Sequence, residues 1–312
     1  MNKVIAFLGV SFDNKEIIKK EFSKALINNN IKDLANVEIL CISANNKIDN
    51  KFLAKLPKLK YIITRSVGYD HIDLKASLKR KIKVSNISDY GSSVIAEFVF
   101  ALLLSGLRNI DLADKYVEKN YRFDKKGLTG IALENKTIGI IGLGNIGSKV
   151  ARIASLGFHM NTIVYTPNKN QKLAKQLNFK YVSLNKLWKE PDIISLHCPL
   201  NKKTRHLINS KNIKKMKDNV VIVNTSRGGL INTKDLTKAI LSKKVSRAFL
   251  DVIEHEDNIL KNKKLIDIPE VIVTPHIAYY ADDSSLNRYK LSFKAILAYI
   301  NNKKLPDLIS GI

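Results

Sequence analysis

Three glycines near the middle of the chain carry the strongest chemical signal in the sequence. The stretch "TIGIIGLGNIGSKVARIA" places Gly142, Gly144 and Gly147 in a G-x-G-x-x-G pattern, after an apolar segment and before an amphipathic one. In a strand–turn–helix unit, the first glycine permits the tight turn, the second lets the backbone approach a pyrophosphate, and the third allows close packing of helix on strand. The helix N-terminus offers N–H groups to the phosphates. The pattern therefore predicts a dinucleotide site.

The strand predicted next, "NTIVYTPNKN", bears on the identity of the dinucleotide. An acid at the end of this strand normally accepts hydrogen bonds from the adenosine ribose, and Thr166 stands in its place, with Lys169 three residues further on. A hydroxyl group can still bond to a ribose, but it lacks the negative charge that would repel the additional phosphate of NADP. We predict NAD as the cofactor and keep NADP as the alternative.

Single polar residues follow three other apolar runs. His276 follows one in "VIVTPHIAYY", Arg227 lies in "VIVNTSRGG", and Glu256 lies in "AFLDVIEHE". A lone imidazole beside an apolar run favours a packed structural histidine over a proton carrier. Arg227 could equally be a solvated arginine, and Glu256 could belong to a solvated acidic turn. Each residue taken alone leaves its role open.

The segments around these residues alternate between strand-like and helix-like patterns. In the first hundred residues, "KVIAFLG", "VEILCIS", "KYIITRS" and "IKVSNIS" read as strands, and "NKEIIKKEFSKALINN" reads as a helix between the first two. A second series runs from "KTIGIIG" to "EVIVTPH". One long helix is predicted from Ser92 to about Lys119, with a buried first half, and a last helix from about Ser284 to Asn301. Strands alternating with helices indicate parallel βαβ units.

These patterns predict an α/β protein with two doubly wound domains, Rossmann-like or flavodoxin-like, and a cleft between them. The substrate domain would comprise residues 1–97 plus 279–312, and the dinucleotide-binding domain residues 98–278. A chain of 312 residues has enough volume for two such cores.

Composition excludes several classes of protein. No segment approaches the roughly 20 apolar residues of a membrane helix, and the apolar run from Val4 to Val10 is too short for a secretory signal. The two cysteines, Cys41 and Cys198, lie far apart in the sequence, which favours a reducing cytoplasm. The net charge of +25 comes from lysines scattered through every region, so no specific nucleic-acid partner is predicted.

The remaining histidines give no sign of a metal site. None forms the H-E-x-x-H spacing, so we predict no metal. His197 is expected to satisfy a strand end or to back the cofactor loop. His71 and His206 are expected to be structural or at the surface, and His255 to be exposed.

Taken together and in this order, the motifs identify the chain as similar to a known family. "TRSVGYDHID", "VNTSRGGLI", "LDVIEHE" and "TPHIAYY" resemble those of the D-isomer-specific 2-hydroxyacid dehydrogenases over nearly the whole chain, nearest to the D-lactate dehydrogenase branch. The resemblance implies reversible reduction of a small 2-keto acid, pyruvate or a similar one, to the D-2-hydroxy acid, and it suggests a homodimer. Glyoxylate, hydroxypyruvate or a branched acid is the alternative substrate. A dinucleotide-sensing binding protein is the more distant alternative, supported only by the positive charge.

The resemblance assigns roles to particular residues. Arg227 matches the arginine that holds the substrate, His276 the proton donor and acceptor, and Glu256, rather than Glu254, the acid that orients the histidine. On the substrate side it implies Val67 and Gly68, through their backbone N–H groups, together with Tyr90 and Tyr279, although either tyrosine could equally be a packing residue. The cofactor contacts it implies, besides Gly142, Gly144, Gly147 and Thr166, are Asn145, Ile146, Cys198, Pro199, Thr204, Thr225, Ser226 and Asp251.

The chemistry agrees with the three catalytic assignments. Reduction of a 2-keto acid needs a hydride at C2 and a proton on the oxygen, which a neutral imidazole cannot donate. A buried carboxylate beside His276 favours the imidazolium form. The planar fork of Arg227 suits the oxygens of an anionic substrate. Each motif follows a predicted strand, and open α/β sheets bind ligands at the carboxyl ends of their strands.

Overall fold

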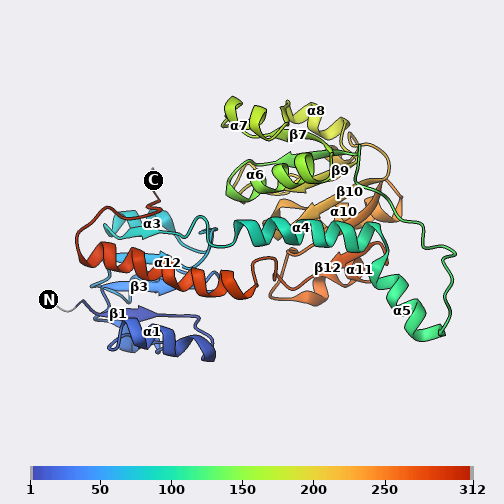
Figure 1. The fold of residues 1–312 in the computed structure, drawn as a ribbon. Helices are drawn as coiled ribbons and strands as arrows, with labels where there is room; N and C mark the ends of the chain where they lie inside the picture. The colour runs from blue at the N-terminus through green and yellow to red at the C-terminus, as the bar shows by residue number, and fades with distance from the viewer. Residues whose placement is uncertain (1–2, 310–312) are drawn as a thin grey trace. The chain divides into compact units, whose positions relative to one another are not determined.

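The computed structural model describes residues 3–309 and divides the chain into two compact units. The first unit contains the chain up to Gly91 together with the segment from Ala281 onward, and the second runs from Ser92 to Tyr280. Figure 1 shows the elements of each unit. The prediction of two α/β domains built on parallel sheets is confirmed.

The first unit is built on a five-stranded parallel sheet with strand order β2-β1-β3-β4-β5. Its strands are β1 (Ile5–Phe7), β2 (Leu26–Ile27), β3 (Ile39–Ile42), β4 (Tyr61–Thr64) and β5 (Lys83–Ser85). Its helices are α1 (Lys15–Glu21), α2 (Asn50–Leu53), α3 (Leu74–Lys79) and α12 (Asp282–Ile300), with short 3₁₀ turns at Phe12–Asn14 and Ile31–Leu34. This 2-1-3-4-5 order is the flavodoxin-like arrangement.

The second unit is built on a seven-stranded parallel sheet with strand order β12-β11-β10-β9-β6-β7-β8. Its strands are β6 (Thr137–Ile141), β7 (Asn161–Tyr165), β8 (Lys180–Tyr181), β9 (Ile193–Leu196), β10 (Val220–Asn224), β11 (Val245–Leu250) and β12 (Val271–Val273). Its helices are α4 (Ser92–Leu107), α5 (Ile110–Asn120), α6 (Asn145–Arg152), α7 (Gln171–Gln176), α8 (Leu184–Lys189), α9 (Ser210–Ile213), α10 (Thr233–Leu241) and α11 (Lys263–Ile266). The strand order reverses between β6 and β9, which is where a Rossmann sheet binds its dinucleotide.

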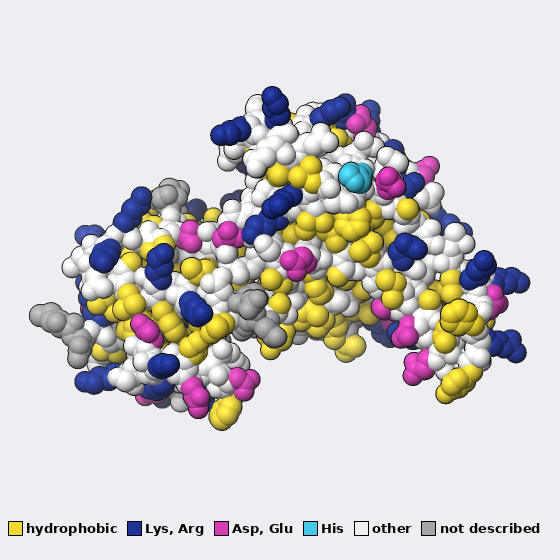
Figure 2. Space-filling model, in the orientation of Figure 1, with side chains coloured by type: hydrophobic (Ala, Val, Ile, Leu, Met, Phe, Trp, Pro, Cys, Tyr) yellow, Lys and Arg dark blue, Asp and Glu magenta, His cyan; other side chains and the backbone are white. Residues whose placement is uncertain are grey.

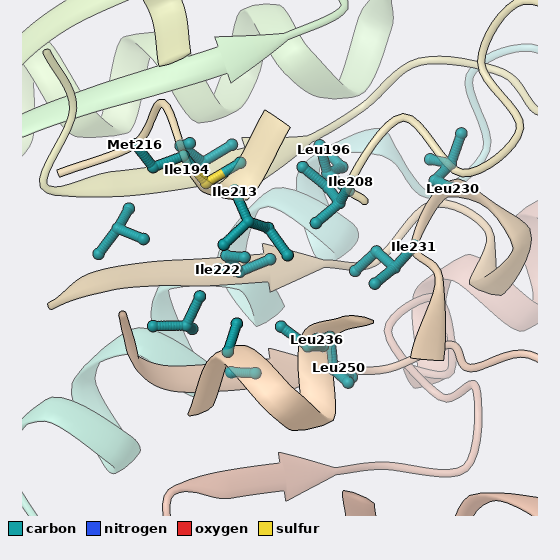
Figure 3. Packing of buried hydrophobic residues seen from close by; sticks show 14 of the residues in the cluster. Ile194, Leu196, Ile208, Ile213, Met216, Ile222, Leu230, Ile231, Leu236 and Leu250 are labelled. Carbon is teal, nitrogen blue, oxygen red and sulfur yellow. The ribbon is translucent and has the colours of Figure 1, made fainter. Parts of the chain in front are cut away.

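Continuous apolar runs form the central strands because both faces of the second sheet are covered. On one face, Ile222 of β10 and Leu250 of β11 pack with Leu236 of α10 (Figure 3). On the other face, α4 and α6 pack on the sheet around Ile138 and Val223. This double cover holds the carboxyl ends of six neighbouring strands in fixed register, and the predicted site residues follow those ends.

Two predicted helices differ from those observed, and the short edge strand β8 was not predicted. The long helix expected from Ser92 to Lys119 is two helices, α4 and α5, which meet at a bend of 50°. Asn109 has a left-handed backbone (φ +56°) between them, and asparagine is among the few residues that adopt it at small cost. The helix predicted to reach Asn29 ends at Glu21. Leu26–Ile27 instead pairs with β1 as an edge strand.

Within residues 3–309, no single helix is long and apolar enough to cross a membrane. The bent pair of α4 and α5 reaches the required length and apolar content only when its two helices are taken together.

Candidate active site

His276 lies in the turn that follows β12 and is paired with a carboxylate. Its Nδ1 atom is 3.1 Å from Oε2 of Glu256, and the two side chains are 37% and 45% exposed, so the carboxylate that was expected to be buried is exposed. The backbone of His276 is left-handed (φ +56°), which is unusual for a residue with a side chain and is retained only where surrounding bonds enforce it. The ring of Tyr279 lies edge-on to the imidazole, 6.2 Å between centroids.

Asp251 supplies the bonds that enforce this turn. It is 1% exposed and directly follows β11. Its carboxylate accepts hydrogen bonds from the Thr274 hydroxyl (2.6 Å) and from the N–H groups of Ile277 (2.8 Å) and Ala278 (2.9 Å), and its carbonyl accepts one from the His276 N–H (2.9 Å). The resemblance placed Asp251 near the nicotinamide, and the structure gives this buried carboxylate a complete set of partners within the histidine turn.

Arg227 is half-buried three residues after β10, in a loop closed by its own neighbours. The Asn224 amide donates to the Arg227 carbonyl (2.9 Å) and its oxygen accepts from the Ser226 N–H (3.0 Å). The Ser226 hydroxyl donates to the Cys198 carbonyl (2.8 Å), and the Arg227 guanidinium donates to the Ser226 carbonyl (2.7 Å). The hydrogen bond from Ser226 to Cys198 therefore connects the loop after β10 to the loop after β9.

The glycine motif forms a loop that fits a pyrophosphate. Gly142 has φ +97°, and a Cβ there would lie 2.5 Å from the His197 carbonyl oxygen. A Cβ on Gly147 would clash with the Gly142 carbonyl oxygen. Around Gly144, the N-cap of α6, a Cβ would meet no atom within 4 Å, so this side of the loop is open. Asn145 and Ile146 form the first turn of α6, whose N–H groups point toward that opening.

Other predicted cofactor residues line the same edge. Thr225 directly follows β10, is 7% exposed, and its buried hydroxyl has no hydrogen-bond partner among the described residues, as expected of a group that bonds to a ligand. Burial raises the pKa of the Cys198 thiol to about 11, so the thiol is neutral and packs rather than reacts. Thr204 donates to the carbonyl of the exposed Pro199 (2.6 Å) and so shapes the loop after β9.

Thr166 directly follows β7 and begins a loop of defined conformation. The loop ends at Asn170, which caps α7 and donates its N–H to the Tyr181 hydroxyl (2.9 Å). Thr166 is half-buried and Lys169 is exposed. The side chain that directly follows β7 is therefore a hydroxyl, with a lysine three residues further along.

His197 backs the glycine loop, one of the two roles expected for it, because its backbone and Cβ contact Gly142 and Gly147. Its Nε2 atom lies 2.7 Å from the Ser195 hydroxyl, and burial of the ring lowers the pKa of His197 to about 4. The imidazole is therefore neutral at pH 7. His255 is exposed, as expected, and His71 bonds to the Thr64 hydroxyl (3.0 Å).

The lowered pKa of His197 predicts a pH-dependent stability. An ordinary histidine in the unfolded chain protonates near pH 6.5, whereas the folded one does so near pH 4. The free energy of unfolding is therefore highest above about pH 6.5. It decreases by up to about 3 kcal/mol as the pH falls toward 4, because the unfolded chain then binds a proton that folded His197 does not. We expect His197→Gln to flatten the free energy of unfolding, measured in urea, across this range. An unchanged slope in the variant would contradict the assignment, and His159→Gln, at an exposed histidine, is the control.

The remaining predicted residues belong to the first unit, where a loop follows β4. The Val67 carbonyl accepts from the Asn86 amide (2.6 Å), and the Gly68 carbonyl accepts from the Ser66 hydroxyl (2.7 Å). Tyr90 is 8% exposed. Arg65, which sequence reasoning missed, is 1% exposed and donates to the carbonyls of Leu8, Gly9 and Cys41.

Arg65 thereby ties the start of this loop to the carboxyl ends of β1 and β3. Its guanidinium also lies 5.0 Å from the centre of the Tyr289 ring. No carboxylate pairs with it among the described residues. Nothing in the sequence separates this buried arginine from the many exposed basic residues.

Across the edge of the second sheet, neighbouring strands present the predicted groups in order. His276 follows β12, Asp251 and Glu256 follow β11, Arg227 follows β10, Cys198 follows β9, Gly142 follows β6, and Thr166 follows β7. In the part of the chain that the structure describes, no group of three His, Cys, Asp or Glu side chains could hold a metal ion. A glycine cradle, an arginine and a histidine–carboxylate pair along one edge of a parallel sheet are typical of a dinucleotide-dependent oxidoreductase.

Comparison with known proteins identifies the family. Residues 100–278 match the NAD-binding domain of the D-isomer-specific 2-hydroxyacid dehydrogenases. The chain is 34% identical to a glyoxylate reductase from Thermococcus litoralis over 286 residues, covering 90% of this chain and 86% of that protein. It is 39% identical to a hydroxypyruvate reductase from Thermotoga maritima over 250 residues, covering 79% of each.

A solved structure shows the same fold over nearly the whole chain. The D-lactate dehydrogenase from Aquifex aeolicus, complexed with NAD and lactic acid, superimposes with a TM-score of 0.89 at 33% identity and covers 96% of both chains. The chain belongs to the D-isomer-specific 2-hydroxyacid dehydrogenase family. It is an oxidoreductase that uses a nicotinamide cofactor to interconvert 2-keto and 2-hydroxy acids.

Proposed function

We propose that the enzyme reduces pyruvate, or a 2-keto acid of similar size, to the D-2-hydroxy acid, with NADH as the cofactor. The pairing of His276 Nδ1 with the Glu256 carboxylate is the observation that carries the proposal. It leaves Nε2 as the ring atom that can exchange a proton with a substrate. The D-lactate dehydrogenase similar to this chain binds NAD and lactic acid, which supports both the substrate and the cofactor.

The proposed chemistry assigns one task to each group. When bound, the nicotinamide cofactor would supply the hydride for C2 of the substrate. As the carbonyl double bond breaks, its electron pair moves to the oxygen, which takes the proton from Nε2 of His276. Glu256 stabilises the imidazolium before the transfer and orients the ring. Arg227 holds the substrate's oxygens through its guanidinium fork.

We further assign the substrate carboxylate to the backbone N–H groups of Val67 and Gly68. Two hydrogen bonds on their carbonyls hold this loop in one conformation. Tyr90 and Tyr279 are proposed to bound the side of the substrate away from its carboxylate, and Tyr279 already lies against the His276 ring. Asn145, Ile146 and the three glycines are proposed to bind the pyrophosphate.

Steady-state kinetics tests this proposal directly. Pyruvate, glyoxylate, hydroxypyruvate and a branched 2-keto acid should be compared by kcat/KM with NADH. We expect pyruvate to give the largest value. If glyoxylate or hydroxypyruvate gave the largest kcat/KM instead, the activity would be that of the glyoxylate and hydroxypyruvate reductases to which the chain is similar. If no 2-keto acid supported oxidation of NADH or NADPH, the proposal that this protein reduces 2-keto acids would be wrong. A dinucleotide-sensing protein would then be the better explanation.

Cofactor preference depends on Thr166. A carboxylate at this position would repel the 2′-phosphate of NADP, whereas a hydroxyl would not. We expect measurable activity of the wild type with both cofactors, higher with NADH, and a further shift toward NADH in Thr166→Asp by about tenfold in the ratio of kcat/KM values. Asn161→Asp adds the same charge at the opposite end of β7 and should leave the ratio unchanged. An unchanged ratio in Thr166→Asp would remove Thr166 from the ribose site.

We also propose that the enzyme is a homodimer assembled through its second unit. Large apolar side chains are exposed on α5 and on the segment after it, most of all Leu112 (59%), Tyr121 (92%) and Phe123 (101%). Figure 2 shows hydrophobic side chains on this region, and α5 projects away from the sheet of its own unit (Figure 1). An exposed apolar surface of this kind is typical of a protein interface.

Sedimentation velocity tests the assembly. We expect a dimer for the wild type and a monomer for the double variant Leu112→Glu with Phe123→Asp, because the charges would have to be buried at the interface. Leu78→Glu, at an exposed leucine of the first unit, should remain dimeric. A dimer that survives the double variant would place the interface elsewhere.

Cytoplasmic location is proposed because Cys41 and Cys198 are both free thiols, as is usual in a reducing compartment. Recovery of the activity in the periplasmic or extracellular fraction of cells would contradict it.

A further inference from the structure

Glu254 lies two residues before Glu256 and is held quite differently. Its Oε1 atom is 2.7 Å from Nε2 of His206, and its Oε2 atom accepts a hydrogen bond from the N–H of Thr233 (2.9 Å), the first residue of α10. Burial opposes the charged form, but these hydrogen bonds outweigh it and hold the pKa of Glu254 below its usual range. At neutral pH this carboxylate is therefore an anion that bonds to a side chain and to a helix N-terminus.

The same residues connect three separate loops at the carboxyl edge of the second sheet. His206 belongs to the loop after β9, and its N–H donates to the carbonyl of Gly229, two residues after Arg227 (2.8 Å). Glu254 belongs to the loop after β11, and its carbonyl accepts from the Asn262 amide (2.6 Å). The His206–Glu254 pair therefore links the loop that carries Arg227 to the loop that carries Glu256.

A direct backbone contact closes this arrangement. Gly228 packs so tightly on the peptide between Ile253 and Glu254 that a Cβ on Gly228 would clash with the Ile253 carbonyl. Any side chain there would push the two loops apart. Glu256, by contrast, is 45% exposed, and among residues 3–309 its side chain bonds only to His276. The position of Glu256 must therefore come from its backbone, which Glu254 anchors two residues away.

We propose that the Glu254–His206 pair is a positioning device that holds Glu256 against His276 and fixes the Arg227 loop beside it. This inference rests on the proposed function, because it assigns a task in the same proton transfer. Glu254 itself does not replace Glu256, because both of its oxygens are already engaged by His206 and Thr233. Its effect on the reaction passes through Glu256.

Substitution of Glu254 by glutamine separates this role from simple folding. Glu254→Gln keeps the size of the side chain, and its amide can still bond to His206 and to the Thr233 N–H, but it removes the negative charge that makes both bonds strong. We expect kcat for 2-keto acid reduction to fall about tenfold, with a smaller change in the KM of the keto acid and no change in the dissociation constant of NADH. Glu190→Gln, which removes the charge of a surface pair on α8, is the matched control and should have no effect.

Two comparisons identify the route of the effect. If Glu254 acts through Glu256, the double variant Glu254→Gln with Glu256→Gln should be no slower than Glu256→Gln alone, because effects along one route do not add. His206→Gln places a donor where Nε2 was and should retain most of the activity, whereas His206→Ala should resemble Glu254→Gln. Additive losses in the double variant, or a normal kcat in Glu254→Gln, would overturn the proposal.

A measurement without turnover distinguishes failure of this inference from failure of the proposed function. The distance between Nδ1 of His276 and the Glu256 carboxylate can be measured in crystal structures of the wild type and of Glu254→Gln. We expect the 3.1 Å contact of the wild type to be lost in Glu254→Gln, because the loop that carries Glu256 is held less firmly. If the wild type reduced no 2-keto acid, the distance would still report on the pair. An unchanged contact in Glu254→Gln would exclude the positioning role.

Discussion

Replacement of His276 by glutamine is expected to lower kcat for 2-keto acid reduction by about a thousandfold, within the range that a lost general acid accounts for. Glutamine keeps a hydrogen-bonding side chain of similar reach but cannot donate a proton and recover it. The dissociation constant of NADH, measured by fluorescence quenching, should stay within about twofold, because the glycine cradle follows β6, four strands away from β12 in the sheet.

The direction of the reaction gives the same residue a second test. Reduction requires the protonated imidazole and should decline as the pH rises, whereas oxidation of the D-2-hydroxy acid requires the neutral form and should increase. Both dependences should disappear in His276→Gln. His255→Gln is the matched control, because His255 is exposed on a neighbouring loop and has the same left-handed backbone (φ +55°). Near-normal turnover in His276→Gln would remove this histidine from the mechanism.

Replacement of Arg227 by lysine is expected to raise the apparent KM for the keto acid by about a hundredfold and to lower kcat as well. Lysine keeps the charge but replaces a planar fork by a single ammonium group, so the paired hydrogen bonds to the substrate's oxygens are lost. The hydrogen bond from the guanidinium to the Ser226 carbonyl would be lost too, and with it the fixed direction of the side chain.

Arg205→Lys controls for charge and size at the same edge of the sheet. Arg205 is exposed, and its side chain lies near Gly229. Gly229 is the second residue after Arg227 in the chain. The control should bind and reduce the keto acid normally. If Arg227→Lys had an unchanged KM, the substrate would have to be held by other groups, and the assignment of Arg227 would be wrong.

The sequence predicted the elements well wherever the signal was local. Apolar runs ending in polar residues predicted every strand except the two-residue edge strands β2 and β8, and the glycine spacing predicted the turn after β6. The prediction of a single helix from Ser92 to Lys119 was wrong because its apolar pattern continues past Asn109, while the backbone turns there. The helix over residues 14–29 was wrong in its second half because Leu26 and Ile27 gain more from pairing with β1 than from continuing α1.

The sequence by itself determined that the chemical groups share one edge of the sheet, since each lies within six residues of the end of a strand and parallel strands place their carboxyl ends together. It did not determine the bonds between those groups. The four hydrogen bonds of Asp251, the pairing of Glu254 with His206, and the burial of Arg65 join residues 23 to 57 positions apart. A polar side chain becomes fully bonded or exposed according to which loops meet at the sheet edge, and only the tertiary structure decides that.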